Sequence, residues 1–163
     1  MVRHVASYSK WLVPGLRLGY FVAPQEVTNR AVGCRSSGTA NHFASLAVEG
    51  YLTEHLQDHK DDLSESLGAK ANAMVASLGE NFGGTGAKWA VPQGGCYTWL
   101  TMPEGTPMSE LVDEAFDAGV GYLPGVSFAP NGDGQNCSRL CFAYETPAKN
   151  RDGIGRMPES LTG

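Results

Sequence analysis

Residues 7–20 read SYSKWLVPGLRLGY, a polar loop and a turn between two short apolar runs. The run from Val2 to Ser7 predicts the end of a strand that enters the loop. The run from Leu16 to Ala23 alternates imperfectly and predicts a second short strand. Pro14-Gly15 is a strong turn signal between them. The segment therefore predicts two strands joined by a loop that turns the chain back.

Lys10 is the residue of this loop with the clearest chemical potential. It follows Ser7 and Ser9, and Arg17 lies seven positions further on, after the turn. An amine, hydroxyl groups and a guanidinium at a strand end can hold a phosphate and leave a nucleophilic amine beside it. A lysine between serines in a loop is also commonly just solvated, so these residues alone leave both interpretations open.

The middle of the chain predicts helices. A short helix is expected from Gln25 to about Arg35, where residues 36–39 break it. From Asn41 to about Leu78 apolar residues recur at intervals of three, four and seven, which predicts one long helix or two, with Gly68 as the weak point. The apolar positions are Phe43, Leu46, Ala47, Gly50, Tyr51, Leu63, Leu67, Ala71, Met74 and Leu78.

The C-terminal half alternates short strands with helices. Strands are expected at residues 88–91, 96–102, 119–123 and 138–144. The turn Pro92-Gln93-Gly94-Gly95 joins the first two strands. Ser109 is expected to cap a helix that ends at Ala118, and Thr146-Pro147 is expected to begin the terminal helix. Such alternation predicts an α/β or α+β arrangement.

Composition excludes several classes of protein. Of the 163 residues 42% are hydrophobic, which is enough to form a core. Twelve Lys and Arg against 17 Asp and Glu give a net charge of -5, which argues against nucleic-acid binding because contacts to a phosphate backbone need clustered cations. No apolar run is long enough for a membrane span and no signal peptide is recognisable, so a soluble cytoplasmic protein is expected.

Cysteine and histidine spacings predict no metal site. The cysteines are Cys34, Cys96, Cys137 and Cys141, and they form neither a CxxC pair nor a compact disulfide framework. They are expected to be reduced and mostly buried as small apolar residues. His55 and His59 are four residues apart on a predicted helix, a spacing that suits one metal ion, but no third ligand accompanies them. A solvated helix face is the preferred interpretation.

Four segments together resemble a known family. The first is residues 7–20, with Ser7-Tyr8-Ser9-Lys10 and then Pro14-Gly15-Leu16-Arg17-Leu18-Gly19-Tyr20. The others follow in the family's order as PQGGCYTWL at 92–100, GVGYLPGVSF at 119–128 and SRLCFA at 138–143. They are similar to segments of class I/II aminotransferases, the fold type I enzymes that use pyridoxal 5′-phosphate (PLP). Within that family the segments resemble those of 2-aminoadipate and aromatic aminotransferases and of MocR-type regulators, which carry the same domain.

The resemblance implies roles for individual residues. Lys10 would bind PLP covalently and shuttle a proton during amino-group transfer from an amino acid to a 2-oxo acid. Ser7 and Arg17 would hold the PLP phosphate, with help from Ser9. Arg139 would clamp the substrate α-carboxylate, a task that suits a planar guanidinium. Family members usually act as homodimers, which is therefore the expected state of a full-length protein.

The resemblance also implies a fragment. Family members place the lysine past the middle of a much longer chain, whereas Lys10 has nine residues before it. The implied fold is α/β: residues 1–35 as the last part of the large cofactor-binding domain, and residues 36–163 as the α+β C-terminal small domain with its long connecting helix. The chain alone is expected to be inactive and to expose unpaired strand edges and an apolar face.

Two other interpretations stay open. One is the effector-sensing domain of a MocR-type transcription regulator, whose winged helix would lie upstream of this segment. The other is a domain that has lost activity, or an interaction module. The residues of this chain do not separate the enzyme from the regulator.

Overall fold

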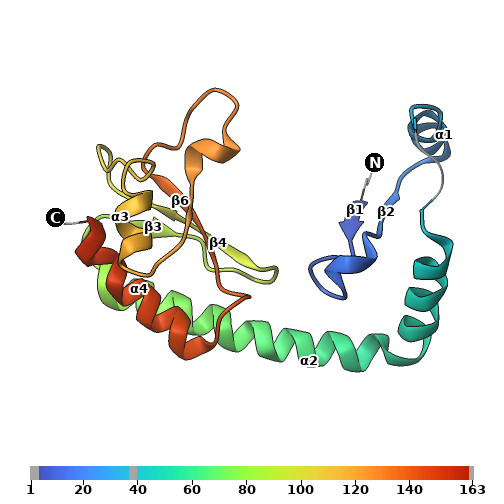
Figure 1. Cartoon of the computed structure of the whole chain (residues 1–163), viewed down its shortest axis with the longest axis horizontal. Helices are drawn as coiled ribbons and strands as arrows, with labels where there is room; N and C mark the ends of the chain where they lie inside the picture. Colours follow the sequence, from blue (N-terminus) through green and yellow to red (C-terminus); the bar gives the residue numbers. More distant parts are fainter. Residues whose placement is uncertain (1–3, 37–39, 162–163) are drawn as a thin grey trace. The chain divides into compact units, whose positions relative to one another are not determined.

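The computed structural model describes residues 4–36 and 40–161, with side chains as far as Met157. The chain divides into two compact units, an N-terminal unit (Met1–Leu63) and a C-terminal unit (Ser64–Gly163), which are described separately. One helix, α2 (His42–Phe82), contributes residues to both. Figure 1 shows the elements of each unit.

The N-terminal unit begins with an antiparallel pair of strands, β1 (His4–Ser7) and β2 (Gly19–Val22). Ser7 lies opposite Gly19 in the ladder, and a Cβ atom on Gly19 would lie 2.8 Å from the Ala6 carbonyl oxygen. Only glycine therefore fits this approach of the strands. The two strands and the turn between them confirm the prediction over the described residues; Val2 and Arg3 of the first predicted strand lie outside them. The turn is a short 3-10 helix, η1 (Pro14–Leu16).

Helices follow the hairpin. The predicted short helix is confirmed as α1 (Gln25–Gly33). α2 is one continuous helix, and Gly68 does not interrupt it. A small core joins α2 to the hairpin loop: Leu18, Ala44 and Val48 are buried, with Tyr8, Leu12, Leu16 and Leu52 packed against them.

The predicted apolar face of α2 is wrong in its first turns. Phe43 is 87% exposed and Leu46 is 50% exposed, whereas Ala44 and Val48 are buried. Ala44 and Val48 belong to the core formed with the loop between β1 and β2, whereas the larger side chains of Phe43 and Leu46 remain exposed. Further along, Ala71, Met74 and Leu78 are buried as predicted.

The C-terminal unit contains a four-stranded antiparallel sheet in the order β3-β4-β6-β5. Its strands are β3 (Lys88–Trp89), β4 (Tyr97–Thr101), β5 (Leu123–Pro124) and β6 (Cys137–Cys141). β4 and β6 form the longest ladder, in which Trp99 lies opposite Arg139. The predicted strand pair around the turn at residues 92–95 is confirmed. The strand predicted at residues 119–123 is wrong except at Leu123, because β5 begins there and continues to Pro124. The other three predicted strands are longer than the observed ones.

Three helices of this unit share one apolar core. They are the second half of α2, α3 (Val112–Asp117) and α4 (Pro147–Leu161). The fully buried side chains include Leu78 of α2, Leu100 of β4, Phe142 after β6 and Met157 of α4. Tyr122 is also buried and donates its hydroxyl proton to the Met108 carbonyl oxygen at 2.7 Å. Burial, with a smaller effect of Glu114, raises the pKa of Tyr122 to about 12.

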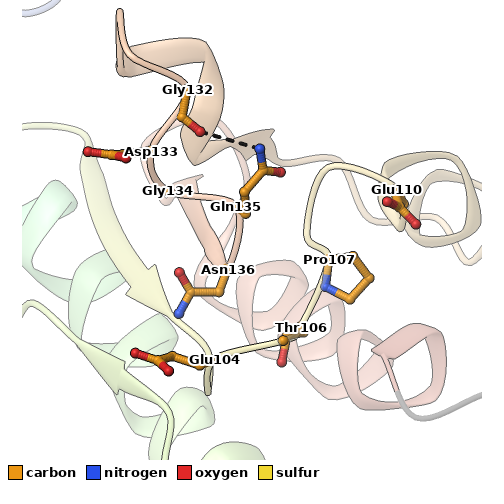
Figure 2. A pocket seen from close by; sticks show the side chains of 10 residues that line it. Glu104, Thr106, Pro107, Glu110, Gly132, Asp133, Gly134, Gln135 and Asn136 are labelled. Atoms are coloured by element: carbon orange, nitrogen blue, oxygen red, sulfur yellow. Dashed lines mark hydrogen bonds between the residues drawn. The ribbon is translucent and has the colours of Figure 1, made fainter.

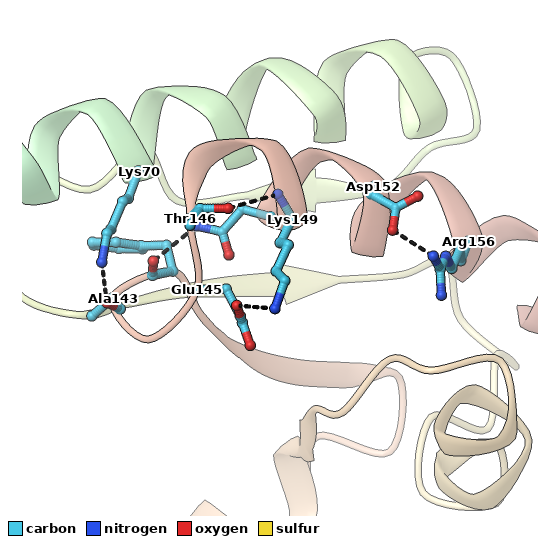
Figure 3. A network of polar contacts seen from close by, with 9 residues as sticks. Lys70, Ala143, Glu145, Thr146, Lys149, Asp152 and Arg156 are labelled. Carbon is cyan, nitrogen blue, oxygen red and sulfur yellow. Dashed lines mark hydrogen bonds and ion pairs between the residues drawn. The ribbon is translucent and has the colours of Figure 1, made fainter.

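α4 begins where the sequence predicts. The backbone N–H of Lys149 donates to Thr146 Oγ1 at 3.3 Å, which makes Thr146 the cap of the helix. Lys70 Nζ of α2 donates to the Ala143 carbonyl oxygen at 2.7 Å, close to the start of α4 (Figure 3). These bonds attach the chain after β6 to the two helices.

Two predictions about local structure are wrong. Ser109 does not cap α3, because the N-cap position is Leu111 and no side chain caps the helix. The Ser109 hydroxyl is buried and has no hydrogen-bond partner among the described residues. The four cysteines, all among the described residues, form no disulfide, but Cys34 and Cys141 are exposed and Cys96 and Cys137 are half-buried, so they are not core residues.

The helices of the described ranges do not combine the length and the hydropathy that a membrane crossing requires.

Candidate active site

The loop between β1 and β2 brings Ser7, Ser9 and Arg17 together. The backbone N–H of Ser9 donates to Ser7 Oγ at 3.2 Å. Arg17 Nη1 donates to Ser9 Oγ at 3.2 Å and reaches the Pro14 carbonyl oxygen at 3.5 Å. Both serine oxygens thus act as acceptors, and the proton of each hydroxyl stays available to donate to an anion.

Arg17 has a left-handed backbone, with φ 51° and ψ 40°. It is the only non-glycine residue with a positive φ in the described part of the chain. This conformation costs a non-glycine residue about 1–2 kcal/mol. Glycine would relieve that cost, so an arginine here is consistent with a use for its guanidinium.

Lys10 lies in the same loop and is exposed. Its ammonium makes no hydrogen bond and no ion pair with any described residue. The loop therefore places a solvent-accessible amine near two hydroxyl groups and a guanidinium. This donor set fits a phosphate ester that also carries a carbonyl group, since the phosphate needs donors and the carbonyl needs an amine.

His59 is a partner of this loop that the sequence analysis missed. Its Nε2 lies 2.6 Å from the Trp11 carbonyl oxygen, and its Nδ1 lies 3.2 Å from the Tyr51 hydroxyl oxygen. A carbonyl oxygen only accepts, so Nε2 carries the hydrogen. The prediction of a solvated face is wrong for His59, which is half-buried, whereas His55 is exposed. The only local sequence signal for these contacts was Tyr51, which lies two helical turns before His59 on the same helix.

Arg139 lies in the middle of β6, in the C-terminal unit. It is half-buried, and its Cζ atom lies 4.1 Å from the centre of the Tyr97 ring and 4.5 Å from the centre of the Phe128 ring. Among the described residues it forms no ion pair and no hydrogen bond through its side chain. An unpaired, half-buried guanidinium held by aromatic rings is suited to bind a carboxylate.

Two pockets of the described residues lie away from the predicted site residues. An open pocket of about 540 Å³ in the C-terminal unit is lined by residues that include Glu104, Glu110, Asp133 and Gln135 (Figure 2). A pocket of about 380 Å³ in the N-terminal unit is mainly apolar and includes His59 in its wall. The predicted residues instead form two groups, one in each unit: Ser7, Ser9, Lys10 and Arg17 in the first, and Arg139 in the second.

Comparison with known proteins relates nearly the whole chain to one family. The model of the family "Aminotransferase class I and II" matches residues 3–157. Aromatic-amino-acid aminotransferase 1 of Thermococcus litoralis is 32% identical over 98% of this chain. An uncharacterized HTH-type transcriptional regulator of Bacillus subtilis is 29% identical over 98% of the chain.

The fold matches a solved structure over the same extent. The crystal structure of LysN, an α-aminoadipate aminotransferase from Thermus thermophilus complexed with N-(5′-phosphopyridoxyl)-L-leucine, superposes with a TM-score of 0.90 at 26% identity. That match covers 99% of this chain and 42% of LysN. The chain spans 39% of the length of the Thermococcus enzyme and 33% of the regulator. The chain thus has the fold of a portion of these longer proteins.

Proposed function

We propose that the chain, since it belongs to the class I and II aminotransferase family, carries the lysine, the phosphate ligands and the carboxylate ligand of a PLP-dependent aminotransferase. Proteins of this family use PLP. The parent reaction would transfer an amino group from an amino acid to a 2-oxo acid. One observation carries the proposal: an exposed, unpaired lysine amine shares a loop with hydrogen-bonded Ser9 and Arg17.

The phosphate of PLP would be held by Ser7, Ser9 and Arg17. Ser9 Oγ already accepts from Arg17, so its own proton is directed elsewhere and can meet a phosphate oxygen. Ser7 Oγ accepts from the Ser9 backbone N–H, which leaves its proton free in the same way. The guanidinium adds positive charge, and a charge-assisted bond to phosphate is stronger than a neutral one.

Lys10 would be the catalytic residue. When bound, PLP supplies an electron sink for the charge that develops at the substrate Cα. Lys10 Nζ would bind the cofactor covalently before the substrate arrives. Lys10 Nζ would also serve as the base that takes the proton from the substrate Cα and as the acid that returns it.

Arg139 would bind the α-carboxylate of the substrate. The described residues leave its N–H donors unused, so two parallel hydrogen bonds to a carboxylate are available. This pair of hydrogen bonds would fix the orientation of the bound amino acid and would also increase its affinity.

Reductive trapping tests the assignment of Lys10. The chain is incubated with PLP and reduced with borohydride, and the modified lysines are mapped by peptide mass spectrometry. We expect modification of Lys10 in preference to the exposed Lys60, and we expect Arg17→Gln and Ser7→Ala each to remove that preference although Lys10 is intact. Lys60→Ala is the matched control and should leave the extent of labelling at Lys10 unchanged. Equal labelling of both lysines in the unmodified chain would contradict the proposal.

Activity of the segment alone is expected to be negligible. The chain corresponds to 39% of the Thermococcus enzyme, and the remaining part of that protein has no counterpart in it. Transamination by the purified chain, free of contaminating enzyme, would show this expectation to be wrong. The domain boundary at residue 35, the homodimer and the cytoplasmic location stay predictions.

A second candidate function is supported by the similarity to the Bacillus regulator, which covers 98% of the chain. The segment would then bind PLP and sense an effector within a MocR-type protein. The genomic sequence upstream of the codon for Met1 separates the two: a helix-turn-helix there favours the regulator. Its absence favours the enzyme.

A further inference from the structure

We propose that Tyr97 and Phe128 are positioning residues for Arg139, and that their rings hold its guanidinium so that the N–H donors face a substrate carboxylate. This inference rests on the proposed function of Arg139. It adds two residues to the site, neither of which would touch the reacting atoms. Their contribution would be to fix a long side chain before the substrate arrives.

The contacts lie within the range of cation–π attraction. Arg139 Cζ is 4.1 Å from the Tyr97 ring centre and 4.5 Å from the Phe128 ring centre. A cation within about 6 Å of a ring centre is attracted by the negative face of the ring. A cation–π contact uses the charge of the guanidinium and none of its N–H donors as a hydrogen-bond donor to an oxygen. No described residue forms an ion pair or a hydrogen bond with the N–H groups of the Arg139 guanidinium.

The two rings come from different elements of the unit. Tyr97 belongs to β4, which pairs with one edge of β6, and β5 pairs with the other edge. The 3-10 helix η2 (Gly125–Phe128) directly follows β5 and ends at Phe128. Arg139 therefore contacts one ring from a paired strand and one ring from the 3-10 helix that follows β5.

Gly125 makes the approach of η2 possible. A Cβ atom on this residue would lie 2.5 Å from the Gly134 carbonyl oxygen and 2.6 Å from Cys137 Cβ. The chain of η2 therefore lies against the start of β6 with no room for a side chain. Phe128 in turn meets Trp99 edge-on, with ring centres 5.6 Å apart. These contacts fix the Phe128 ring beside Arg139.

Fixing Arg139 in advance lowers the entropy lost on binding. An arginine side chain has many rotamers, and ordering it upon carboxylate binding costs affinity. The contacts with two rings limit those rotamers in the free protein. Loss of one ring should thus weaken carboxylate binding while the charge itself is retained.

Acetate binding followed by NMR tests this inference in the 163-residue chain. The Arg139 Nε–H resonance is identified by its absence in Arg139→Lys, and acetate is the probe. We expect Tyr97→Leu and Phe128→Leu each to move this resonance, because a ring current is lost, and to raise the acetate Kd about fivefold, the effect of about one cation–π contact. Tyr97→Phe keeps the ring and should restore both values.

Tyr144→Leu is the matched control, because Tyr144 lies in the same unit and is 87% exposed. Backbone amide resonances of β4 and β6 report whether a variant keeps the sheet, and Phe128→Leu serves if Tyr97→Leu does not fold. The proposal is overturned if both leucine variants match the control in resonance position and in Kd. If acetate shifts the backbone amide resonances of β4 and β6 with the same Kd in Arg139→Lys as in the unmodified chain, the carboxylate role itself is overturned, and the positioning role falls with it.

Discussion

His59 of α2 holds the backbone of Trp11, the residue after Lys10, through a 2.6 Å contact between Nε2 and the carbonyl oxygen. Tyr51 contacts the other ring nitrogen at 3.2 Å, so both nitrogens of the imidazole have partners. The loop that carries the proposed catalytic lysine is thus attached to a helix by a side chain 48 positions later in the sequence.

His59→Phe should loosen this loop. The substitution removes the donor to the Trp11 carbonyl, and loss of one such bond costs about 1 kcal/mol of stability. The Leu12 amide, which donates to the Tyr8 carbonyl oxygen at 2.9 Å, should exchange its hydrogen faster. Urea unfolding and hydrogen exchange measure the two effects. His55→Phe, at an exposed histidine of the same helix, is the control; equal effects of both variants would argue against a specific role of His59.

Arg17→Gly should separate stability from cofactor binding. Glycine accepts φ 51° without the cost that arginine has, so the variant should be up to about 1 kcal/mol more stable than the unmodified chain. It should also lose preferential trapping of PLP on Lys10, since the guanidinium is absent. Arg17→Gln keeps the conformational cost of a non-glycine residue at this φ. It should therefore lose the preferential trapping of PLP on Lys10 without gaining stability. Thermal unfolding and borohydride trapping give the two readouts, and normal trapping in Arg17→Gly would refute the phosphate role.

Gly125→Ala should destabilise the C-terminal unit. Its new methyl group would lie about 2.5 Å from the Gly134 carbonyl oxygen, so η2 or β6 must move. The expected cost is about 1–3 kcal/mol, as for other overpacked sites. Gly121→Ala is the matched control, because a Cβ there meets nothing within 4 Å. Denaturant unfolding compares the two, and a Gly125→Ala variant as stable as the control would contradict the close approach.

Ser138→Ala should be neutral or stabilising. The Ser138 side chain is fully buried, and its Oγ finds no hydrogen-bond partner within the described residues. Removing an unsatisfied hydroxyl removes its desolvation cost. Ser77→Ala offers the contrast, since Ser77 is equally buried but donates to the Arg151 carbonyl oxygen at 3.0 Å. That variant should lose about 1 kcal/mol. Chemical denaturation of both variants tests the difference.

Val5→Glu should reduce self-association of the chain. Val5 is 82% exposed on β1, and its ladder partner Phe21 is 41% exposed on β2. Apolar side chains on a two-stranded ribbon with unpaired edges favour association between copies. Light scattering at increasing concentration measures this. Val91→Glu, at a 69% exposed valine of the C-terminal unit, adds the same charge elsewhere and should have the smaller effect.

Local relationships were predictable from the sequence, whereas distant ones were not. Ser7, Ser9 and Arg17 share one short loop, so their spacing and the Pro14-Gly15 turn suffice to place them near each other. The contact of His59 with Trp11 depends on how α2 packs on that loop, which no local pattern encodes.

The surroundings of Arg139 show the same limit. Its proposed role was predicted from the resemblance, but its contacts with Tyr97 and Phe128 depend on the register of three strands and on the close approach at Gly125. The sequence predicts Ser109 as the N-cap of α3 because serine is a common residue at that position. In the structure α3 begins later, at Val112, and the hydroxyl is buried instead.

Each hydroxyl oxygen of Ser7 and Ser9 accepts one hydrogen bond within the Lys10 loop, and the proton of each hydroxyl stays available to donate. The Arg17 guanidinium has donors and no acceptor, so these three side chains offer an incoming molecule more donors than acceptors. A fully ionised oxyanion can use every one of these donors, whereas an ammonium group can use only the remaining lone pair of each hydroxyl oxygen. The hydrogen-bonding capacity of the loop is therefore biased toward anions.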